Sequence, residues 1–235
     1  MSEKFVFTID GVEVEATQGQ TILEAAADAG IYIPSLCYMK DLIPHGSCRV
    51  CTVKVDGRFQ AGCVQPAAPG IKVENDTPEL LEIRRDLIEM LFVEGNHYCM
   101  FCEKSGDCEL QALGYRFGIA APKYKYLFPD RKLDATHPDI FIDRNRCVLC
   151  GRCVNASRDI DGKTVFEFVG RGIDKAVAVN SEVSLSETDL SVDDKAIDVC
   201  PVGCIIRKHE GFKTPIGQRK YDHEPIGSDI ESRKA

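Results

Sequence analysis

The stretch RNRCVLCGRCVNAS, residues 144–157, contains three cysteines separated by two residues each. Such a run can wrap one loop around a cubic four-iron cluster so that each thiolate meets a different iron, and a remote Cys-Pro pair can supply the fourth thiolate. The pair Cys200-Pro201 fills that role here. Zinc sites more often use two separated cysteine pairs, and a disulfide scaffold is a further alternative. The ligands expected for a [4Fe-4S] cluster are Cys147, Cys150, Cys153 and Cys200.

A second group of four cysteines lies nearer the N-terminus. Its members are Cys37, Cys48, Cys51 and Cys63. Their spacing differs from the plant-type two-iron pattern only in a longer first gap. The small residues Gly46, Ser47 and Gly62 let backbone N–H groups approach cluster sulfides. We expect a [2Fe-2S] cluster at this group, with a zinc site as the alternative.

A third group lies between the other two, in NHYCMFCEKSGDCELQ, residues 96–111. Its cysteines are Cys99, Cys102 and Cys108. Tetrahedral zinc and the cubic four-iron cluster both need four ligands, so one ligand is missing. His97 is the first candidate because it lies beside the three thiolates in the sequence. Cys204, the one cysteine left over, is the second, and an oxygen ligand or a three-iron cluster is the third possibility.

Composition favours metal binding over the other uses of cysteine. The chain has 235 residues, twelve cysteines and a formal net charge of -8. Residues 1–10 lack the basic and apolar parts of a secretory signal, and no apolar run approaches the roughly 20 residues that cross a bilayer, so we expect a cytoplasmic protein without a membrane segment. Clustered cysteines in that compartment more often bind metal than form disulfides. The acidic balance argues against a nucleic-acid partner.

Hydrophobic patterning and turn residues predict the elements of the N-terminal part. Residues 5–16 read as a hairpin that turns at Asp10-Gly11, and residues 51–59 as a further strand with a second Asp-Gly turn. Between them, a capping box of Thr21 and Glu24 begins a helix that ends at Gly30. A second helix runs from Pro78 to Gly95 with Thr77 as its N-cap. Its apolar residues at helical spacing, expected to face the core, are Leu80, Ile83, Leu87 and Leu91.

The C-terminal half reads as short strands and helices around the third cysteine run. Strands are expected at residues 139–143, 164–170 and 175–180, and a short helix at 193–199. After Gly211 the chain is polar and aperiodic, so this tail is either flexible or ordered by a partner. The expected fold is α+β, in four parts. They are residues 1–77, 78–135, 136–210 and the tail 211–235.

The order of the three groups resembles a known family. From Phe5 to about Ile206 the chain is similar to the N-terminal part of the large iron-sulfur subunit of respiratory complex I and of iron-only hydrogenases. The chain most resembles the small diaphorase (Hox-type U) subunits of NAD-reducing nickel-iron hydrogenases. The resemblance lies in the segment CEKSGDCELQ and in a chain that stops soon after CPVGC. The resemblance implies a β-grasp two-iron ferredoxin domain, a small helical His/Cys3 cluster domain and a ferredoxin-like four-iron domain. It also implies that His97 is the fourth ligand of the middle cluster, although only Tyr98 separates it from Cys99, where the complex I pattern has three residues.

The same resemblance implies the function. The sequence contains neither of the nucleotide-binding motifs G-x-x-x-x-G-K-S/T and G-x-G-x-x-G, and Gly170-Arg171-Gly172 reads as a turn. No free C-x2-C pair remains to bind a nickel-iron centre. We therefore expect no catalytic site in this chain. The family relays electrons through one [2Fe-2S] and two [4Fe-4S] clusters, between a diaphorase subunit that holds FMN and NAD and nickel-iron hydrogenase subunits. By analogy, the two-iron domain faces the flavin and the last cubane faces the hydrogenase. The alternatives are the same electron relay in a formate dehydrogenase, bifurcating hydrogenase or complex I-like assembly, and a zinc-binding structural module.

Overall fold

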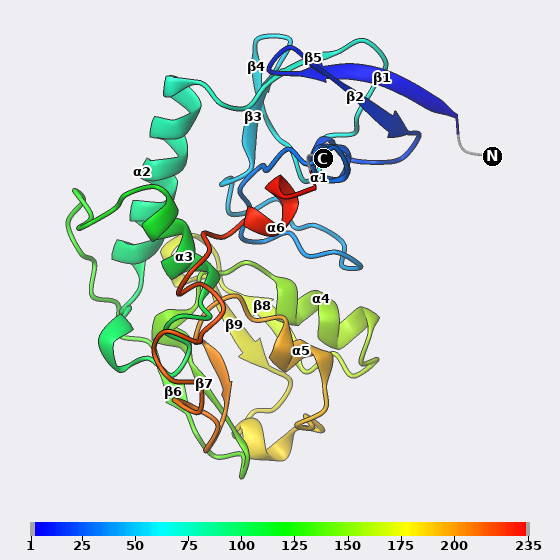
Figure 1. Ribbon diagram of the computed structural model, residues 1–235. Helices are drawn as coiled ribbons and strands as arrows, with labels where there is room; N and C mark the ends of the chain where they lie inside the picture. Colours follow the sequence, from blue (N-terminus) through cyan, green and yellow to red (C-terminus); the bar gives the residue numbers. More distant parts are fainter. Residues whose placement is uncertain (1–2, 234–235) are drawn as a thin grey trace.

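The computed structural model describes residues 3–233 and divides them into an upper sheet region and a lower region of short strands and helices (Figure 1). Helix α2 (Pro78–Glu94) runs along one side of the molecule from the upper region to the lower one. The chain has a mixed α/β fold with small sheets. Within residues 3–233 no helix has the length and apolar character needed to cross a membrane.

The upper region is built on a five-stranded sheet in the order β2-β1-β5-β3-β4. Its strands are β1 (Lys4–Ile9), β2 (Val12–Thr17), β3 (Thr52–Val55), β4 (Arg58–Ala61) and β5 (Lys72–Glu74). Strand β1 pairs antiparallel with β2 and parallel with β5. Asp10 and Gly11 both have positive φ, which matches a two-residue turn to the twist of the strands it joins. The hairpin predicted at Asp10-Gly11 is confirmed, and the second Asp-Gly turn joins β3 to β4.

Helix α1 (Ile22–Asp28) follows the hairpin and begins at the predicted capping box. The Thr21 hydroxyl accepts a hydrogen bond from the Glu24 amide, and the Glu24 carboxylate accepts one from the Thr21 amide at 2.8 Å. Gly30 follows the helix with a φ of 71°, the conformation that favours glycine after a helix end. The residues buried on this helix are Ile22, Leu23, Ala25 and Ala26.

Helix α2 begins at Thr77 as predicted, but its buried face is not purely apolar. The Thr77 hydroxyl accepts from the Leu80 amide at 3.3 Å. Leu80 and Ile88 are fully buried, whereas Ile83, Leu87 and Leu91 are only partly buried. Arg84 is 2% exposed and donates to the carbonyls of Asn75 and Thr52 at 2.8 Å each. Sequence periodicity missed it because the carbonyl groups that need this donor come from distant segments.

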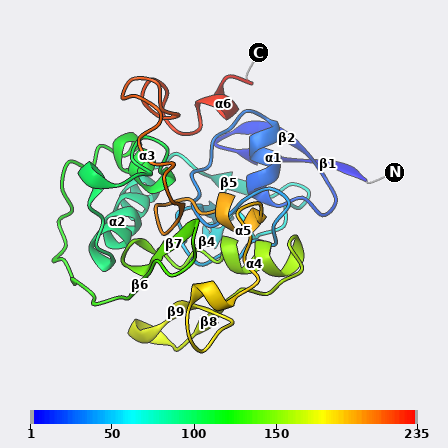
Figure 2. The same ribbon diagram turned by 90° about the horizontal axis from the view of Figure 1, so that it is seen from below.

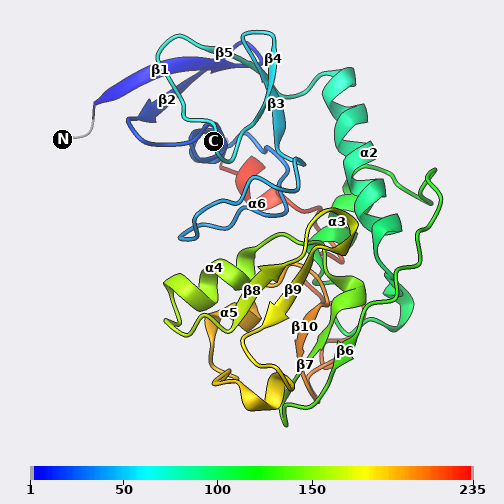
Figure 3. The ribbon, with the colours of Figure 1, turned by 180° about the vertical axis from the view of Figure 1, so that it is seen from behind.

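The lower region combines short helices with small sheets (Figure 3). The helices are α3 (Glu109–Arg116), α4 (Arg152–Asp159) and α5 (Lys195–Asp198). The sheets are β10-β7-β6, formed by β10 (Ile205–Arg207), β7 (Ile140–Asp143) and β6 (Leu133–Asp134), and the hairpin of β8 (Phe166–Val169) and β9 (Ala176–Val179). The strands predicted at 139–143, 164–170 and 175–180 and the helix at 193–199 are confirmed. The turn predicted at Gly170 joins β8 to β9.

Residues 211–233 fold back onto the chain itself, as the view from below makes clear (Figure 2). The Tyr221 amide donates to the Gly106 carbonyl at 3.0 Å. Helix α6 (Ser228–Glu231) ends the segment, and Glu231 pairs with Arg116 of α3. The sequence suggested a flexible tail or one ordered by a partner; in the structure the chain's own middle region orders it. Periodicity could not show this, because these contacts use turns and side chains rather than a regular element.

Candidate metal centres

All twelve cysteines lie within the described residues, and every one is a free thiol. Ten are buried, while Cys99 and Cys147 are partly exposed. The disulfide alternative is therefore wrong. Between residues 3 and 233, no three His, Cys, Asp or Glu side chains are arranged to hold a single metal ion.

The first group forms where a hairpin meets a long loop. The Gly62 amide donates to the Cys51 carbonyl at 3.0 Å, so the β3-β4 ladder brings Cys51 and Cys63 together. Cys37 and Cys48 come from the loop between α1 and β3. The four buried thiols interact as Cys37 with Cys48 and Cys51 with Cys63, and Cys37 also reaches Cys63. The hydrogen bond from the Cys48 thiol lowers the pKa of Cys37, and that from the Cys63 thiol lowers the pKa of Cys51. Two pairs of thiolates are the donor set that two tetrahedral irons require.

The middle group surrounds a small cavity next to α2 and α3. The side chains of His97, Cys99, Cys102 and Cys108 all line it. A short 3-10 helix, η1 (Cys99–Phe101), turns the chain between the first two cysteines, and Cys108 is the N-cap of α3. The three thiols and the imidazole that the sequence selected therefore meet in one place.

His97 reaches this cavity because its ring lies back over Gly95. A Cβ atom on Gly95 would lie 2.6 Å from His97 Nε2, so only glycine fits beneath the ring. Burial lowers the pKa of His97 to about 4, and a hydrogen bond to the backbone of Leu91 acts in the opposite direction. The imidazole is therefore neutral at pH 7. Its Nε2 atom is buried without a hydrogen-bond partner, as a nitrogen reserved for a metal would be.

The third group surrounds a second cavity, beneath the β8-β9 hairpin. Cys147 and Cys150 precede α4, Cys153 lies in its first turn, and Cys200 follows α5. Gly151, with a φ of 80°, makes the tight turn between Cys150 and the helix. Ile142, Phe166 and Val177 form the apolar walls of the cavity.

Cys204 also lines this cavity, and it is absent from the lining of the middle one. Its thiol interacts with those of Cys147 and Cys200. Contact with the Cys204 thiol lowers the pKa of Cys200 to about 6. The structure therefore places Cys204, just before β10, beside the third group rather than beside the middle one.

The loop of the first group packs directly on the third group. Asn155 Nδ2 on α4 donates to the Ile43 carbonyl at 2.7 Å. The His45 ring stacks on Phe168, with ring centroids 5.2 Å apart. Ser47, next to Cys48, donates from its hydroxyl to the Leu149 carbonyl at 3.4 Å.

The middle group packs on the other side of the third group. The Glu109 amide donates to the Pro201 carbonyl at 2.9 Å. Arg146 Nη1 lies 3.5 Å from Cys102 Sγ. A Cβ atom on Gly203 would lie 2.7 Å from the same sulfur, so glycine is needed here for close approach. The third group therefore lies between the other two.

The Arg152 side chain connects residues that lie next to cysteines of all three groups in the sequence. Its guanidinium, 6% exposed, is paired with the Glu109 carboxylate through two hydrogen bonds of 2.7 Å. It also donates to the Tyr38 carbonyl at 2.7 Å. Tyr38 follows Cys37, Glu109 follows Cys108, and Arg152 itself precedes Cys153. The only sequence signal for this role is its place inside the C-x2-C-x2-C run.

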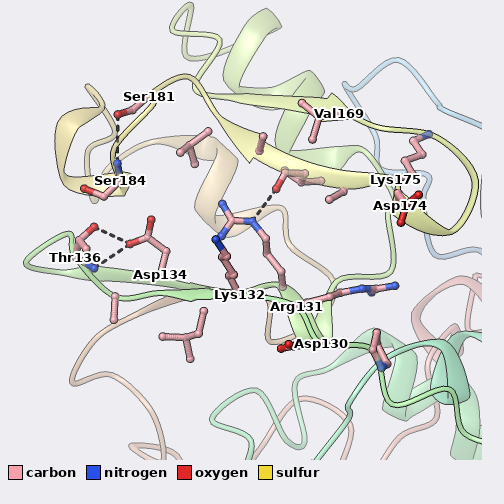
Figure 4. A pocket seen from close by; sticks show the side chains of 18 of the residues that line it. Asp130, Arg131, Lys132, Asp134, Thr136, Val169, Asp174, Lys175, Ser181 and Ser184 are labelled. Atoms are coloured by element: carbon pink, nitrogen blue, oxygen red, sulfur yellow. Dashed lines mark hydrogen bonds between the residues drawn. The ribbon is translucent and has the colours of Figure 1, made fainter.

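A further cleft lies away from the cysteine cavities. It has a volume of about 820 Å³ and lies between residues 129–136 and the β8-β9 hairpin (Figure 4). Arg144 lines it and donates from Nε to the Val177 carbonyl at 2.8 Å. Its lining residues include neither cysteine nor histidine. The candidate metal centres are therefore the two small cavities and the four thiols of the first group.

Family models match three successive parts of the chain. Residues 2–78 match a 2Fe-2S iron-sulfur cluster binding domain. Residues 84–123 match the NADH-ubiquinone oxidoreductase-G iron-sulfur binding region. Residues 137–206 match the ferredoxin-like domain of NADH-quinone oxidoreductase subunit 3. Each matched segment contains one of the three cysteine groups.

Whole-chain comparisons agree with these models. The chain is 41% identical over 220 residues to the NAD-reducing hydrogenase HoxS subunit gamma of Cupriavidus necator, covering 93% of this chain and 94% of that one. It is 35% identical over 208 residues to the NADPH-Fe(3+) oxidoreductase subunit alpha of Geobacter sulfurreducens, of which it spans only 24%. A chain in the crystal structure of an NAD+-reducing [NiFe]-hydrogenase in the H2-reduced state superimposes with a TM-score of 0.94 at 46% identity, with 98% of each chain covered. The chain belongs to the family of the NAD-reducing hydrogenase HoxS subunit gamma.

Proposed function

We propose that this chain is the electron-transfer subunit of an NAD-reducing nickel-iron hydrogenase, in which it relays single electrons between the H2-oxidising and NAD-reducing partners. The observation that carries the proposal is the contact of three thiol groups in a row, with the third group in the centre. The family models for 2Fe-2S and ferredoxin-like domains support the same reading. We expect no catalytic site in this chain, so FMN, NAD and the nickel-iron centre belong to partner subunits.

The proposed centres follow the groups described above. A [2Fe-2S] cluster takes Cys37, Cys48, Cys51 and Cys63. One [4Fe-4S] cluster takes His97, Cys99, Cys102 and Cys108. The other takes Cys147, Cys150, Cys153 and Cys200. The paired thiols of the first group, the unpartnered Nε2 of His97 and the enclosed cavity of the third group all fit these assignments.

Such clusters accept and release one electron at a time with little change in geometry. The chain's own residues hold the ligands still and keep water away. The Leu149 amide lies 3.5 Å from Cys147 Sγ and can donate to it, which stabilises negative charge on the sulfur. The Arg146 guanidinium lies beside Cys102 and places positive charge near the middle group. Both contacts favour the reduced, more negative state of a nearby centre.

The spatial order favours an electron path that differs from the order in the sequence. Contacts join the first group to the third and the third to the middle group, so we propose the path first, third, middle. Family analogy placed the last [4Fe-4S] cluster nearest the hydrogenase. We propose instead that the His97 group lies nearest the hydrogenase. Beside it, Met100 is 86% exposed and Phe101 is 75% exposed. We assign this apolar surface to the hydrogen-activating partner and the five-stranded domain to the flavin side.

The proposed domains follow from this assignment. Residues 1–77 form the two-iron domain of β-grasp type, 78–135 the His/Cys3 domain and 136–210 the ferredoxin-like four-iron domain. The segment 211–235 is an appended tail, whose described part rests on the loop between Cys102 and Cys108.

The test is to isolate the complex through an affinity tag on this chain. The proposal predicts co-purifying nickel and flavin, together with H2-driven reduction of NAD+. A Met100→Glu, Phe101→Glu variant is expected to lose that activity while keeping its iron and sulfide, because both side chains are exposed to solvent although they lie between the proposed ligands Cys99 and Cys102. Ile173→Glu, Val183→Glu, which changes two equally exposed apolar residues outside both proposed partner surfaces, serves as the matched control. A tagged complex with neither nickel nor H2-driven activity would refute the hydrogenase assignment.

A second candidate is the same electron relay in another oxidoreductase complex. It is favoured by the 35% identity to the NADPH-Fe(3+) oxidoreductase subunit. The same purification separates the two, because flavin without nickel indicates the second. Zinc without sulfide indicates a structural module instead.

A further inference from the structure

Five thiols, rather than four, face the cavity of the third group. Cys147, Cys150, Cys153 and Cys200 account for a complete set of ligands, and Cys204 is the fifth. Nothing in the proposed relay uses it. Its side chain is 5% exposed, so it is not available to the surface.

The backbone fixes Cys204 at this position. The Asp143 amide on β7 donates to the Cys204 carbonyl at 2.7 Å, and β10 begins at the next residue. The turn through Pro201 and Gly203 then sets Cys204 four residues after Cys200, on the same cavity wall. The sheet β10-β7 therefore anchors the backbone of Cys204 independently of the Cys200 side chain.

The thiol of Cys204 is selective in what it touches. It interacts with the side chains of Cys147 and Cys200, whereas the thiol interactions found for it do not include Cys150 or Cys153. A thiol so placed can reach an iron that Cys200 or Cys147 serves. Cys200 and Cys147 are therefore the two ligands that it is expected to replace.

We propose that Cys204 is a reserve ligand of the third cluster, able to take the place of Cys200 or Cys147 when either is lost. The proposal rests on the proposed function, since it needs a cluster in this cavity. In a Cys200→Ala chain, the Cys204 thiol gives its proton to solvent and forms the single iron-sulfur bond that Cys200 would have formed. No electron is transferred and no further reactant is needed.

The experiment uses the full chain, prepared anaerobically and supplied with ferrous iron and sulfide. Cys200→Ala is expected to retain about ten irons per chain, and Cys200→Ala/Cys204→Ala about six. The retained cluster in the single variant should have a shifted reduction potential, because one thiolate now comes from a different position. Cys153→Ala is the matched control, expected to fall to about six irons although Cys204 is intact. Cys204→Ala alone should keep about ten irons and an unchanged potential.

Several results would overturn the proposal. Cys200→Ala could be as depleted as the double variant, or could hold about nine irons with the EPR signal of a three-iron cluster. Loss of iron in Cys204→Ala alone would make Cys204 the resident ligand instead. If Cys200→Ala is depleted and circular dichroism shows a misfolded chain, Cys147→Ala decides, because Cys204 also touches Cys147. A wild-type chain that takes up no iron or sulfide refutes the proposed function itself, which separates that failure from the others.

Discussion

The middle and third cysteine groups have the same number of proposed ligands, but they differ in exposure to solvent and in the elements that position their thiols. The third is enclosed by the β8-β9 hairpin, two helices and the loop of the first group, and α4 and β10 position its thiols. The middle group lies on an irregular loop beside exposed Met100 and Phe101, and Cys99 is only partly buried. Regular elements therefore position thiols of the third group, whereas an irregular loop with exposed apolar side chains positions those of the middle group, together with His97, whose ring lies over Gly95.

Arg152 holds the central position, so its loss should have the largest effect. Removing one partner of a buried ion pair costs roughly 3–5 kcal/mol, and the lower end applies here because the Glu109 side chain left unpaired is 23% exposed. We expect Arg152→Met to lower the Tm of the loaded chain by roughly 6 °C or more, at about 2–4 °C per kcal/mol for a chain of this size. Differential scanning calorimetry of the anaerobic protein measures the shift.

The matched control is Arg158→Met on the same helix. Arg158 pairs with Asp159 at the surface. Exposed pairs contribute little to stability, so this variant should melt as the wild type does. Equal shifts for the two variants would show that Arg152 does not join the three groups.

His97→Ala should break the terminal centre while sparing the central one. Loss of the fourth ligand leaves either about nine irons, as a three-iron cluster, or about six. His97→Cys should keep about ten irons and lower the reduction potential of that cluster, because an anionic thiolate replaces a neutral imidazole. Iron analysis and EPR-monitored redox titration measure both. An unchanged spectrum and potential in His97→Cys would remove His97 from the ligand set.

Anaerobic treatment with an iron chelator should separate the two centres by rate. The chelator should reach the middle group first, because Cys99 lies beside the 86% exposed Met100, whereas the neighbours of Cys147, the partly exposed thiol of the third group, are themselves partly buried. The EPR signal of the middle cluster is therefore expected to decay first. Loss of the third signal first, or loss of both together, would contradict the difference in exposure.

Gly95→Ala has the smallest expected effect and tests the space beneath the His97 ring. Its new Cβ would crowd the His97 ring and also approach the Asn145 carbonyl at 2.8 Å. We expect a shifted EPR signal for the middle cluster and an unchanged signal for the third. Gly62→Ala, whose Cβ would lie 3.2 Å from the Cys51 carbonyl in the first group, serves as the control and should leave the signal of the middle cluster unchanged. Identical spectra for Gly95→Ala and the wild type would show that the ring does not need this space.

Local patterns predicted much of the fold. The Asp10-Gly11 hairpin, the Thr21 capping box and the start of α2 at Thr77 all follow from neighbouring residues, and the structure has them. Strands β5 and β6, of three and two residues, are too short to leave a periodic signal. Arg84 was missed because its partners lie in other elements.

The candidate site was also predicted only in part from the sequence. Cysteine spacing selected three groups, and adjacency selected His97 over Cys204 for the middle one. The central position of the third group was not predictable, because it depends on contacts such as Arg152 with Tyr38, which are 114 residues apart. Cys204 illustrates the same point, since β10 carries it to the third cavity rather than to the neighbouring loop.

Iron and acid-labile sulfide, measured on the full chain after anaerobic purification, test the central claim most directly. Three clusters of the proposed types contain about ten irons and about ten sulfides per chain. Values near these, with little zinc, are the expected result. A chain that carries zinc and no inorganic sulfide would contradict it.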